Sequence, residues 1–251
     1  MGYTITVAGK GGVGKTTFTG LIARYLIKSG KGPIFAVDAD ANANLNEVLG
    51  VEADQTVGGV REDVLANINL IPAGMTKEAF IELRLQEAII ETKNFDLMVM
   101  GRPEGPGCYC YANSLLRKYI DLLSDNYKYV VIDNEAGMEH LSRRTTRDID
   151  LMFIVSDAAP VGIDTAKRIS NLVDELKLKV KEKYLVLSRV NGELHPALQK
   201  RIDESGLKLA GIIPADEKIV QLSYDNRPIV DLEDETPAII AADKILKQFV
   251  G

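Results

Sequence analysis

The sequence predicts an α/β fold with a mostly parallel central sheet flanked by helices on both faces. Apolar runs typical of strands alternate with segments in which apolar residues recur at helical spacing, and the alternation continues along the chain. The first apolar run, Tyr3 to Ala8, leads through a glycine-rich loop directly into a helical pattern. Acidic residues follow two further apolar runs, and ligands bind outside the carboxyl ends of strands in open α/β sheets. Together these observations predict a ligand site at the carboxyl edge of the sheet.

The composition fits one large domain with a sizeable core. Of the 251 residues, 46% are hydrophobic and no linker-like segment divides them, so residues 1–251 are expected to form a single domain. There are 36 carboxylates against 30 Lys and Arg, a net charge of −6, which argues against nucleic acid as a partner. No apolar run approaches the ~20 residues of a spanning helix, and no signal peptide is recognisable. The cysteines are Cys108 and Cys110, so we expect a cytoplasmic protein with reduced thiols and no membrane partner.

The amino-terminal part of the chain gives most of its strand and helix signals clearly. Its predicted elements are, in order, a strand over 3–8, a helix over 18–26, a strand over 33–37, a short helix over 42–49, an amphipathic helix over 77–92 and a buried strand over 95–100. Residues 55–67 are polar and give no definite prediction. Residues 69–72 fit either a strand or an extended linker.

The rest of the chain begins with a loop over 101–107, which is too rich in Gly and Pro for regular structure. The predicted elements that follow are a helix over 114–123, strands over 127–132 and 151–155, a helix over 164–176, a strand over 184–187, a helix over 196–205, a strand over 209–213 and a closing helix opened by Thr236-Pro237. That last dipeptide places an N-cap oxygen and a proline where helix starts prefer them.

The first loop carries a nucleotide-phosphate motif. It reads Gly9-Lys10-Gly11-Gly12-Val13-Gly14-Lys15-Thr16-Thr17 and fits the pattern G-x-x-x-x-G-K-[ST]. Its glycines allow backbone N–H groups to turn inward, and the amino terminus of the next helix points at the same anion. Lys15 would neutralise the outer phosphates, and the Thr16 hydroxyl would ligate Mg²⁺. The loop predicts a P-loop site for the phosphates of a nucleotide.

Acidic residues at two strand ends are expected to complete this site. Asp133 closes the strand over 127–132 and matches the residue that holds Mg²⁺ through water opposite the P-loop threonine. Asp40 is the candidate to orient the attacking water, and Asp38 the candidate to support the metal shell. Gly137 would let a backbone N–H approach the γ-phosphate.

Lys10 distinguishes this loop from an ordinary P-loop, because two lysines stand five residues apart. The loop resembles the deviant Walker A group, which contains nitrogenase iron protein, the chromosome-partitioning ParA proteins and the septum-site ATPase MinD. In that group the first lysine reaches across a dimer interface to the nucleotide of the partner. The resemblance implies a homodimer in which Lys10 acts in trans, as an arginine finger does.

Three further motifs narrow the resemblance to one subgroup of these ATPases. They are Cys108-Tyr109-Cys110, Ser114-Leu115-Leu116-Arg117 and the segment Ala136 to Arg143. These motifs look like those of the CooC-type ATPases, which assist nickel insertion into carbon monoxide dehydrogenase. The related AcsF proteins serve acetyl-CoA synthase. The resemblance extends over nearly the whole chain and implies an ATPase whose client is a nickel enzyme.

The base-binding residues depart from the family pattern. Relatives often carry Asn-Lys after the strand that matches 184–187, and that asparagine reads adenine. Here the residues are Ser188-Arg189, and serine can still hydrogen-bond a base edge. The resemblance extends to the loop that contains Pro214, which we expect beside the nucleotide.

The cysteine pair agrees chemically with a metal site shared by two chains. Two thiolates separated by one residue cannot complete a tetrahedral or square-planar site alone, and a disulfide between them would be strained. A two-fold axis through the loop would bring four sulfurs together, a set that suits Ni²⁺ or Zn²⁺.

The sequence therefore predicts a Mg²⁺-dependent, homodimeric ATPase that matures a nickel enzyme, either carbon monoxide dehydrogenase or acetyl-CoA synthase. One alternative is an iron–sulfur reductase, although nitrogenase iron protein has cysteines far apart in sequence. The other is a positioning ATPase, although the segment from Thr236 to Val250 contains only Lys244 and Lys247 as bases, and packing on the core explains it better than a membrane anchor does.

Overall fold

The predicted central sheet is present and contains eight strands in the part of the chain that the structure describes. This computed structural model describes residues 2–67, 69, 71–102, 109–135 and 148–251. The strands lie in the order β3-β4-β2-β5-β1-β6-β7-β8, and every described pairing is parallel except β3 with β4. The strands are β1 (Tyr3–Gly9), β2 (Ile34–Ala39), β3 (Ile90–Glu91), β4 (Asp96–Val99), β5 (Tyr129–Asn134), β6 (Asp148–Ser156), β7 (Lys179–Val190) and β8 (Lys208–Pro214).

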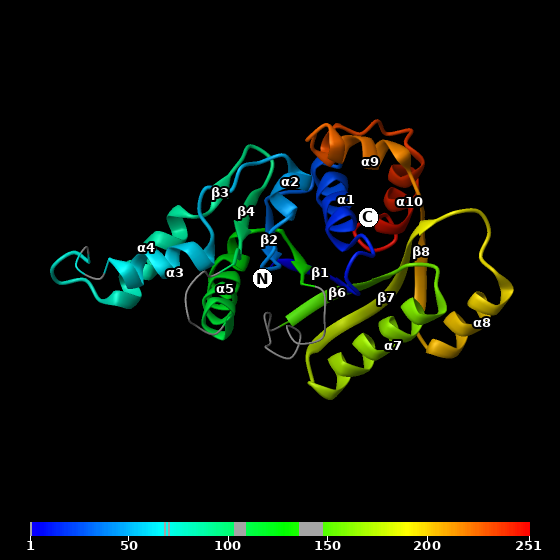
Figure 1. Cartoon of the computed structure of the whole chain (residues 1–251), viewed down its shortest axis with the longest axis horizontal. Coiled ribbons are helices and arrows are strands. Elements are labelled where there is room, and N and C mark those ends of the chain that lie inside the picture. The colour runs from blue at the N-terminus through cyan, green and yellow to red at the C-terminus, as the bar shows by residue number, and fades with distance from the viewer. Residues whose placement is uncertain (1, 68, 70, 103–108, 136–147) are drawn as a thin grey trace.

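Helices cover both faces of this sheet, as the alternating pattern requires (Figure 1). One face carries α1 and α10, and the other carries α3, α4 and α5 over one half and α7 and α8 over the other half. The described helices are α1 (Lys15–Lys28), α2 (Leu45–Leu49), α3 (Val57–Ala66), α4 (Lys77–Glu87), α5 (Tyr109–Leu123), α7 (Pro160–Glu175), α8 (Pro196–Ser205), α9 (Glu217–Tyr224) and α10 (Pro237–Leu246).

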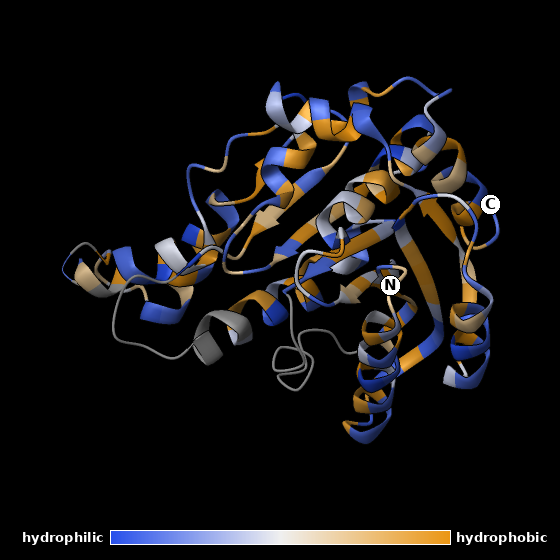
Figure 2. Ribbon diagram, turned by 45° about the vertical axis from the view of Figure 1, so that its right-hand side comes forward, coloured by the Kyte–Doolittle hydropathy of each residue, from blue (hydrophilic) through white to orange (hydrophobic). Residues whose placement is uncertain are grey.

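The core is built by strict alternation along the strands. In β5, Val131 belongs to the cluster under α1 and α10, whereas Val130 and Ile132 belong to the cluster under α3, α4 and α5. This period of two is what a pleated strand covered on both faces produces. In Figure 2 the strands are largely hydrophobic, while the covering helices mix hydrophobic and hydrophilic residues.

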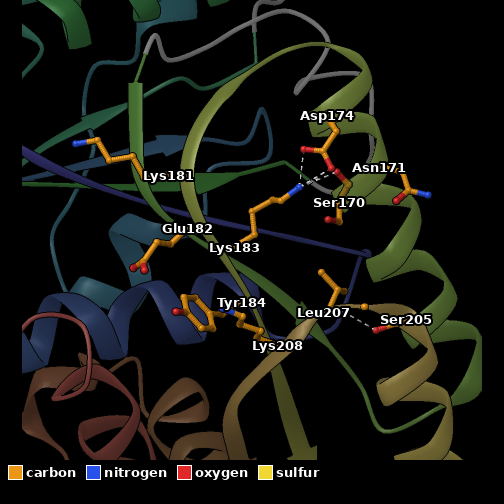
Figure 3. A pocket seen from close by; sticks show the side chains of 11 residues that line it. Ser170, Asn171, Asp174, Lys181, Glu182, Lys183, Tyr184, Ser205, Leu207 and Lys208 are labelled. Atoms are coloured by element: carbon orange, nitrogen blue, oxygen red, sulfur yellow. Dashed lines mark hydrogen bonds and ion pairs between the residues drawn. The ribbon is translucent and has the colours of Figure 1, made fainter.

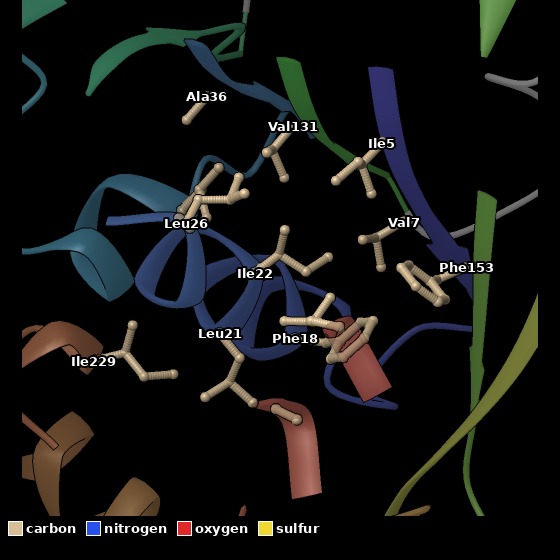
Figure 4. Packing of buried hydrophobic residues seen from close by; sticks show 14 of the residues in the cluster. Ile5, Val7, Phe18, Leu21, Ile22, Leu26, Ala36, Val131, Phe153 and Ile229 are labelled. Atoms are coloured by element: carbon tan, nitrogen blue, oxygen red, sulfur yellow. The ribbon is translucent and has the colours of Figure 1, made fainter. Parts of the chain in front are cut away.

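Helix α1 joins the P-loop to the core. Phe18, Leu21, Ile22 and Leu26 are buried. Phe18 and Ile22 lie on the side of strand residues that include Val7, whereas Leu21 points to the side of Ile229 (Figure 4). The ring of Phe18 meets Phe153 of β6 edge-on at 5.2 Å between centroids. This packing fixes the axis of α1, and therefore the direction in which its amino terminus points.

Several predicted boundaries were wrong. The helix predicted over 77–92 ends at Glu87, because Ile90 and Glu91 pair with β4 as a short edge strand. The helix predicted from Ser114 begins at Tyr109. The indefinite segment 55–67 contains α3, whose first turn is capped by the Thr56 hydroxyl. Of the residues 69–72, those that the structure describes are not in a strand.

Candidate nucleotide-binding site

The P-loop lies between β1, which ends at Gly9, and α1, which begins at Lys15. A Cβ on Gly9 would lie 2.3 Å from the carbonyl oxygen of Val155, so no larger residue fits there without moving the backbone. Gly14 forms the N-cap of α1 with φ +90°, a left-handed conformation that favours glycine. The predicted need for glycine at these two positions thus has a direct steric cause.

The amino terminus of α1 is available to an anion. It has no side-chain cap, and its first turn contains no acidic residue, so its backbone N–H groups and partial positive charge lack a negative partner of their own. Lys15 is buried, and its Nζ donates to the Lys10 carbonyl oxygen at 3.5 Å. The side chain of Lys10 is exposed.

Sheet order brings the predicted acidic residues to this loop. Strand β5 lies between β1 and β2, so Asp133 is the register partner of both Val7 and Asp38. Asp133 is 1% exposed, and its Oδ1 accepts a hydrogen bond from the Thr19 hydroxyl of α1 at 3.2 Å. The carboxylate predicted to serve magnesium is therefore buried beside the helix that carries Thr16.

The pKa of Asp133 is raised to about 7, chiefly by burial and also by the neighbouring charge of Asp38. Hydrogen bonds from the Thr16 and Thr19 hydroxyls and the charge of Lys15 oppose that rise. A buried carboxylate with incomplete compensation gains from a cation, and Mg²⁺ prefers oxygen ligands. The donor set of Asp133 and Thr16 fits this ion.

Asp38 and Asp40 organise the loop that follows β2. The Asp38 carboxylate accepts the backbone N–H of Asp40 at 3.0 Å and that of Leu45 at 2.8 Å. Burial raises the pKa of Asp38, and these N–H donors oppose the rise. Asp40 is half-buried, and its Oδ1 accepts the backbone and side-chain amides of Asn42. The structure thus gives the Asp38 carboxylate a backbone-holding role that the sequence did not indicate.

Ser188 and Arg189 contact the P-loop from the end of β7. The Ser188 hydroxyl donates to the carbonyl oxygen of Val13, and the Arg189 guanidinium donates to that of Gly12 at 2.9 Å. Arg189 has φ +55°, in the left-handed region. Both side chains therefore brace the loop, and the contact of Ser188 with a base stays a prediction beside this contact with Val13.

A cavity of about 400 Å³ opens beside the P-loop. Its walls come from α1, the ends of β7 and β8, and α9, and they include Pro214, the residue that we expect beside the nucleotide. Sequence reasoning missed the α9 wall, although Asp216 is a recognisable helix cap whose carboxylate accepts the Lys218 N–H.

A second hollow, of about 410 Å³, lies between α7, α8 and the amino-terminal halves of β7 and β8 (Figure 3). Its Lys183 is satisfied internally, since Nζ donates to both carboxylate oxygens of Asp174 at 2.7 Å and to the Ser170 carbonyl oxygen at 3.3 Å. The P-loop follows the carboxyl end of β1, so this hollow is at the other end of the strands.

Two predicted elements of the site cannot be placed. Gly137 and Cys108 lie outside the described residues. Cys110 lies in the first turn of α5 rather than in a loop before the helix.

Among the described residues, no cluster of three or more His, Cys, Asp or Glu could hold a metal ion, and no helix is long and apolar enough to span a bilayer.

A glycine loop before a bare helix amino terminus, a buried lysine and a strand-end aspartate together define a P-loop nucleotide-binding protein. The chain belongs to the CobQ/CobB/MinD/ParA nucleotide binding domain family, whose model matches residues 4–229.

Proteins with similar sequences or structures are consistent with membership of this family. An uncharacterized ATP-binding protein of Methanocaldococcus jannaschii is 44% identical over 98% of both chains. The carbon monoxide dehydrogenase accessory protein CooC of Rhodospirillum rubrum is 31% identical over 70% of both chains. The septum site-determining protein MinD of Pyrococcus horikoshii, solved with Mg-ADP, is 22% identical with a TM-score of 0.71 and covers 99% of this chain and 96% of its own. That last likeness shows the fold.

The raised pKa of Asp133 leads to a prediction about stability. The pKa rises from 3.8 to about 7 on folding, so the stability that this group contributes is full below about pH 4 and is lost as pH rises through 7. Without nucleotide or metal, Asp133→Asn should unfold about 4 °C or more above the wild type at pH 8.5 and show little gain at pH 4. Calorimetric scans across this range test the prediction, with Asp225→Asn as a surface control. An equal effect of Asp133→Asn at both pH values would contradict it.

Proposed function

We propose that residues 1–251 form one Mg²⁺-dependent ATPase domain that acts as a homodimer and assists nickel insertion into carbon monoxide dehydrogenase or acetyl-CoA synthase. The P-loop with its bare helix terminus and buried Asp133 supports nucleotide and magnesium binding. The observation that carries the nickel role is the 31% identity to a carbon monoxide dehydrogenase accessory protein, together with the pair Cys108 and Cys110.

Under this proposal, the residues at the P-loop and at the two acidic strand ends have separate roles in hydrolysis. The N–H groups at the start of α1 and the Lys15 ammonium hold the phosphates. Thr16 and Asp133 hold Mg²⁺, which supplies charge neutralisation at the phosphates when bound. Asp40, on the loop that Asp38 fixes, orients the attacking water. Cleavage then transfers the γ-phosphoryl group to water and leaves ADP.

Lys10 makes hydrolysis depend on a second chain. Its side chain is exposed, whereas Lys15 is buried within the same loop. We propose that Lys10 crosses to the nucleotide of the partner when two subunits close and stabilises charge that develops there. The partner in this sense is a second copy of the same chain.

The cysteines couple this closure to metal. Cys110 lies at the start of α5 and Cys108 two residues before it. Two chains supply four thiolates under this proposal, which is a complete ligand set for Ni²⁺ or Zn²⁺, whereas one chain supplies half of it. The metal is the cargo, and nucleotide state governs when the site is complete.

A MinD-like positioning ATPase is the main alternative, since MinD of Helicobacter pylori is 25% identical over the whole of this chain. The packing of α10 argues against a positioning ATPase that binds a membrane through this helix. Ala238, Ile239, Ala242, Ile245 and Leu246 of α10 are buried in the core. A face already used for packing does not supply the apolar surface of an interfacial helix.

Complementation between two inactive variants tests the proposed dimer. Lys10→Gln should bind ADP normally but hydrolyse ATP poorly, and Asp40→Ala should bind ATP yet hydrolyse it far more slowly. An equimolar mixture should recover about a quarter of the wild-type rate, because half of the dimers are mixed and each has one intact site. The control is Lys247→Gln, which removes one positive charge from an exposed lysine just as Lys10→Gln does. A mixture that stays as inactive as its components would refute the trans role of Lys10.

A further inference from the structure

Thr19 is a polar residue on the buried side of α1, one turn beyond the P-loop. Its side chain is 0% exposed. The hydroxyl oxygen lies 3.0 Å from the carbonyl oxygen of Lys15 and 3.2 Å from Oδ1 of Asp133 in β5. A hydroxyl has one hydrogen to donate, so these two oxygens compete for it. Thr19 therefore joins the helix of the P-loop to the carboxylate at the end of β5.

The carboxylate gains more from this hydroxyl than the carbonyl does. Lys15 is the first residue of α1, so its carbonyl oxygen already has a place in the backbone hydrogen-bond pattern of the helix. A hydrogen bond to an ionised group is also roughly twice as strong as one between neutral groups. The contact with Lys15 and the branched side chain together restrict the rotamer of Thr19. The hydroxyl is thus a fixed support for Asp133.

The other hydroxyl at Asp133 has a different task. Thr16 also hydrogen-bonds this carboxylate, but it is the proposed magnesium ligand of the P-loop. Thr19 is one turn deeper in the core, so its hydroxyl serves the carboxylate rather than the ion. Asp38, by comparison, is held by the backbone N–H groups of Asp40 and Leu45. The orientation of Asp133 therefore depends on side-chain hydroxyls, and Thr19 is the one that the ion does not use.

We propose that Thr19 is a positioning residue that orients Asp133 for Mg²⁺ and thereby favours Mg²⁺ over Ca²⁺. The proposal rests on the magnesium-dependent nucleotide function proposed above. Groups that hydrogen-bond a metal-binding carboxylate fix its direction. Mg²⁺ demands near-ideal octahedral geometry, whereas Ca²⁺ accepts six to eight oxygens in a flexible arrangement. A carboxylate that loses this support should therefore lose affinity for Mg²⁺ more than for Ca²⁺.

Calorimetric titration of ADP at fixed free Mg²⁺, at fixed free Ca²⁺ and in EDTA tests this proposal. The contribution of each ion is the ratio of the dissociation constant in EDTA to that with the ion. Thr19→Val keeps nearly the same shape without the hydroxyl. It should lower the Mg²⁺ contribution about tenfold, lower the Ca²⁺ contribution less than about threefold, and leave the affinity in EDTA unchanged.

Two further variants separate positioning from a role in the helix alone. Thr19→Ser keeps the hydroxyl and should match the wild type under all three conditions. Thr165→Val is the matched control, because the Thr165 hydroxyl donates to the carbonyl oxygen four residues earlier, that of Val161, at 2.8 Å. Thr165 lies on α7 rather than on α1. Its replacement should leave all three ADP affinities unchanged.

The possible failures of the two proposals are distinguishable. A wild-type Mg²⁺ contribution in folded Thr19→Val, or equal losses with Mg²⁺ and Ca²⁺, would overturn the inference while the ATPase proposal stands. A loss in EDTA as large as that with Mg²⁺ would also overturn it, because Thr19 would then only hold α1. Thr19→Ala takes the place of Thr19→Val if the valine variant does not fold. Absence of ADP binding to the wild type under every condition would overturn the nucleotide function itself.

Discussion

Lys15→Ala should lower the affinity for Mg-ATP at least about a hundredfold, because several charge-assisted contacts to phosphate are lost together. Its Nζ makes one long hydrogen bond in the structure, to the Lys10 carbonyl oxygen at 3.5 Å, so the fold should survive the change. Calorimetric titration measures the affinity and thermal unfolding checks the fold. Lys247→Ala, at an exposed lysine of the closing segment, is the control.

Near-normal binding by a folded Lys15→Ala protein would remove the P-loop from the nucleotide site. A loss of binding that accompanied unfolding would be resolved by Lys15→Arg. That variant keeps the charge but changes the geometry of the contact, so it should fold and still bind weakly.

Cys108→Ser or Cys110→Ser should lower nickel affinity by orders of magnitude. Each single change leaves two sulfurs in the dimer, and two thiolates cannot complete a four-coordinate soft site. The double variant should therefore bind little worse than either single one. Thiolate-to-metal charge-transfer absorption during nickel titration gives the measurement, and binding should weaken as pH falls because ligation releases protons.

Ser114→Ala, in the same helix α5, is the control for this series. If the wild type bound one nickel ion per chain with no change in oligomeric state, each chain would bind metal by itself. That result would contradict a site built from both chains.

The features that the sequence predicted correctly are those encoded by local patterns of residues. The glycine loop, the strand–helix alternation and the acidic strand ends are visible in contiguous residues, and the sheet confirms the predicted architecture. Thr56 and Asp216 are helix caps of a preferred type, yet α3 and α9 were missed because residues 55–67 are polar and α9 is short.

What the sequence could not predict depends on distant partners. The contact of Ser188 with Val13 joins residues 175 positions apart, and nothing near Ser188 signals it. The raised pKa of Asp133 arises from burial and from Asp38 on the neighbouring strand. Tyr224 meets the cavity wall only because α9 packs beside α1 and β8. These features follow from tertiary packing, which local patterns do not specify.

The central claim is that nucleotide closes a dimer which then holds one metal ion between its chains. Native mass spectrometry of Asp40→Ala with Mg-ATP and nickel tests it most directly, since this variant should bind ATP and keep it intact. We expect a species of two chains, two ATP molecules and one nickel ion, and that species should be absent when Lys10→Gln is added to the same chain. A single chain that carries its own nickel ion, with no change of mass on addition of ATP, would contradict it.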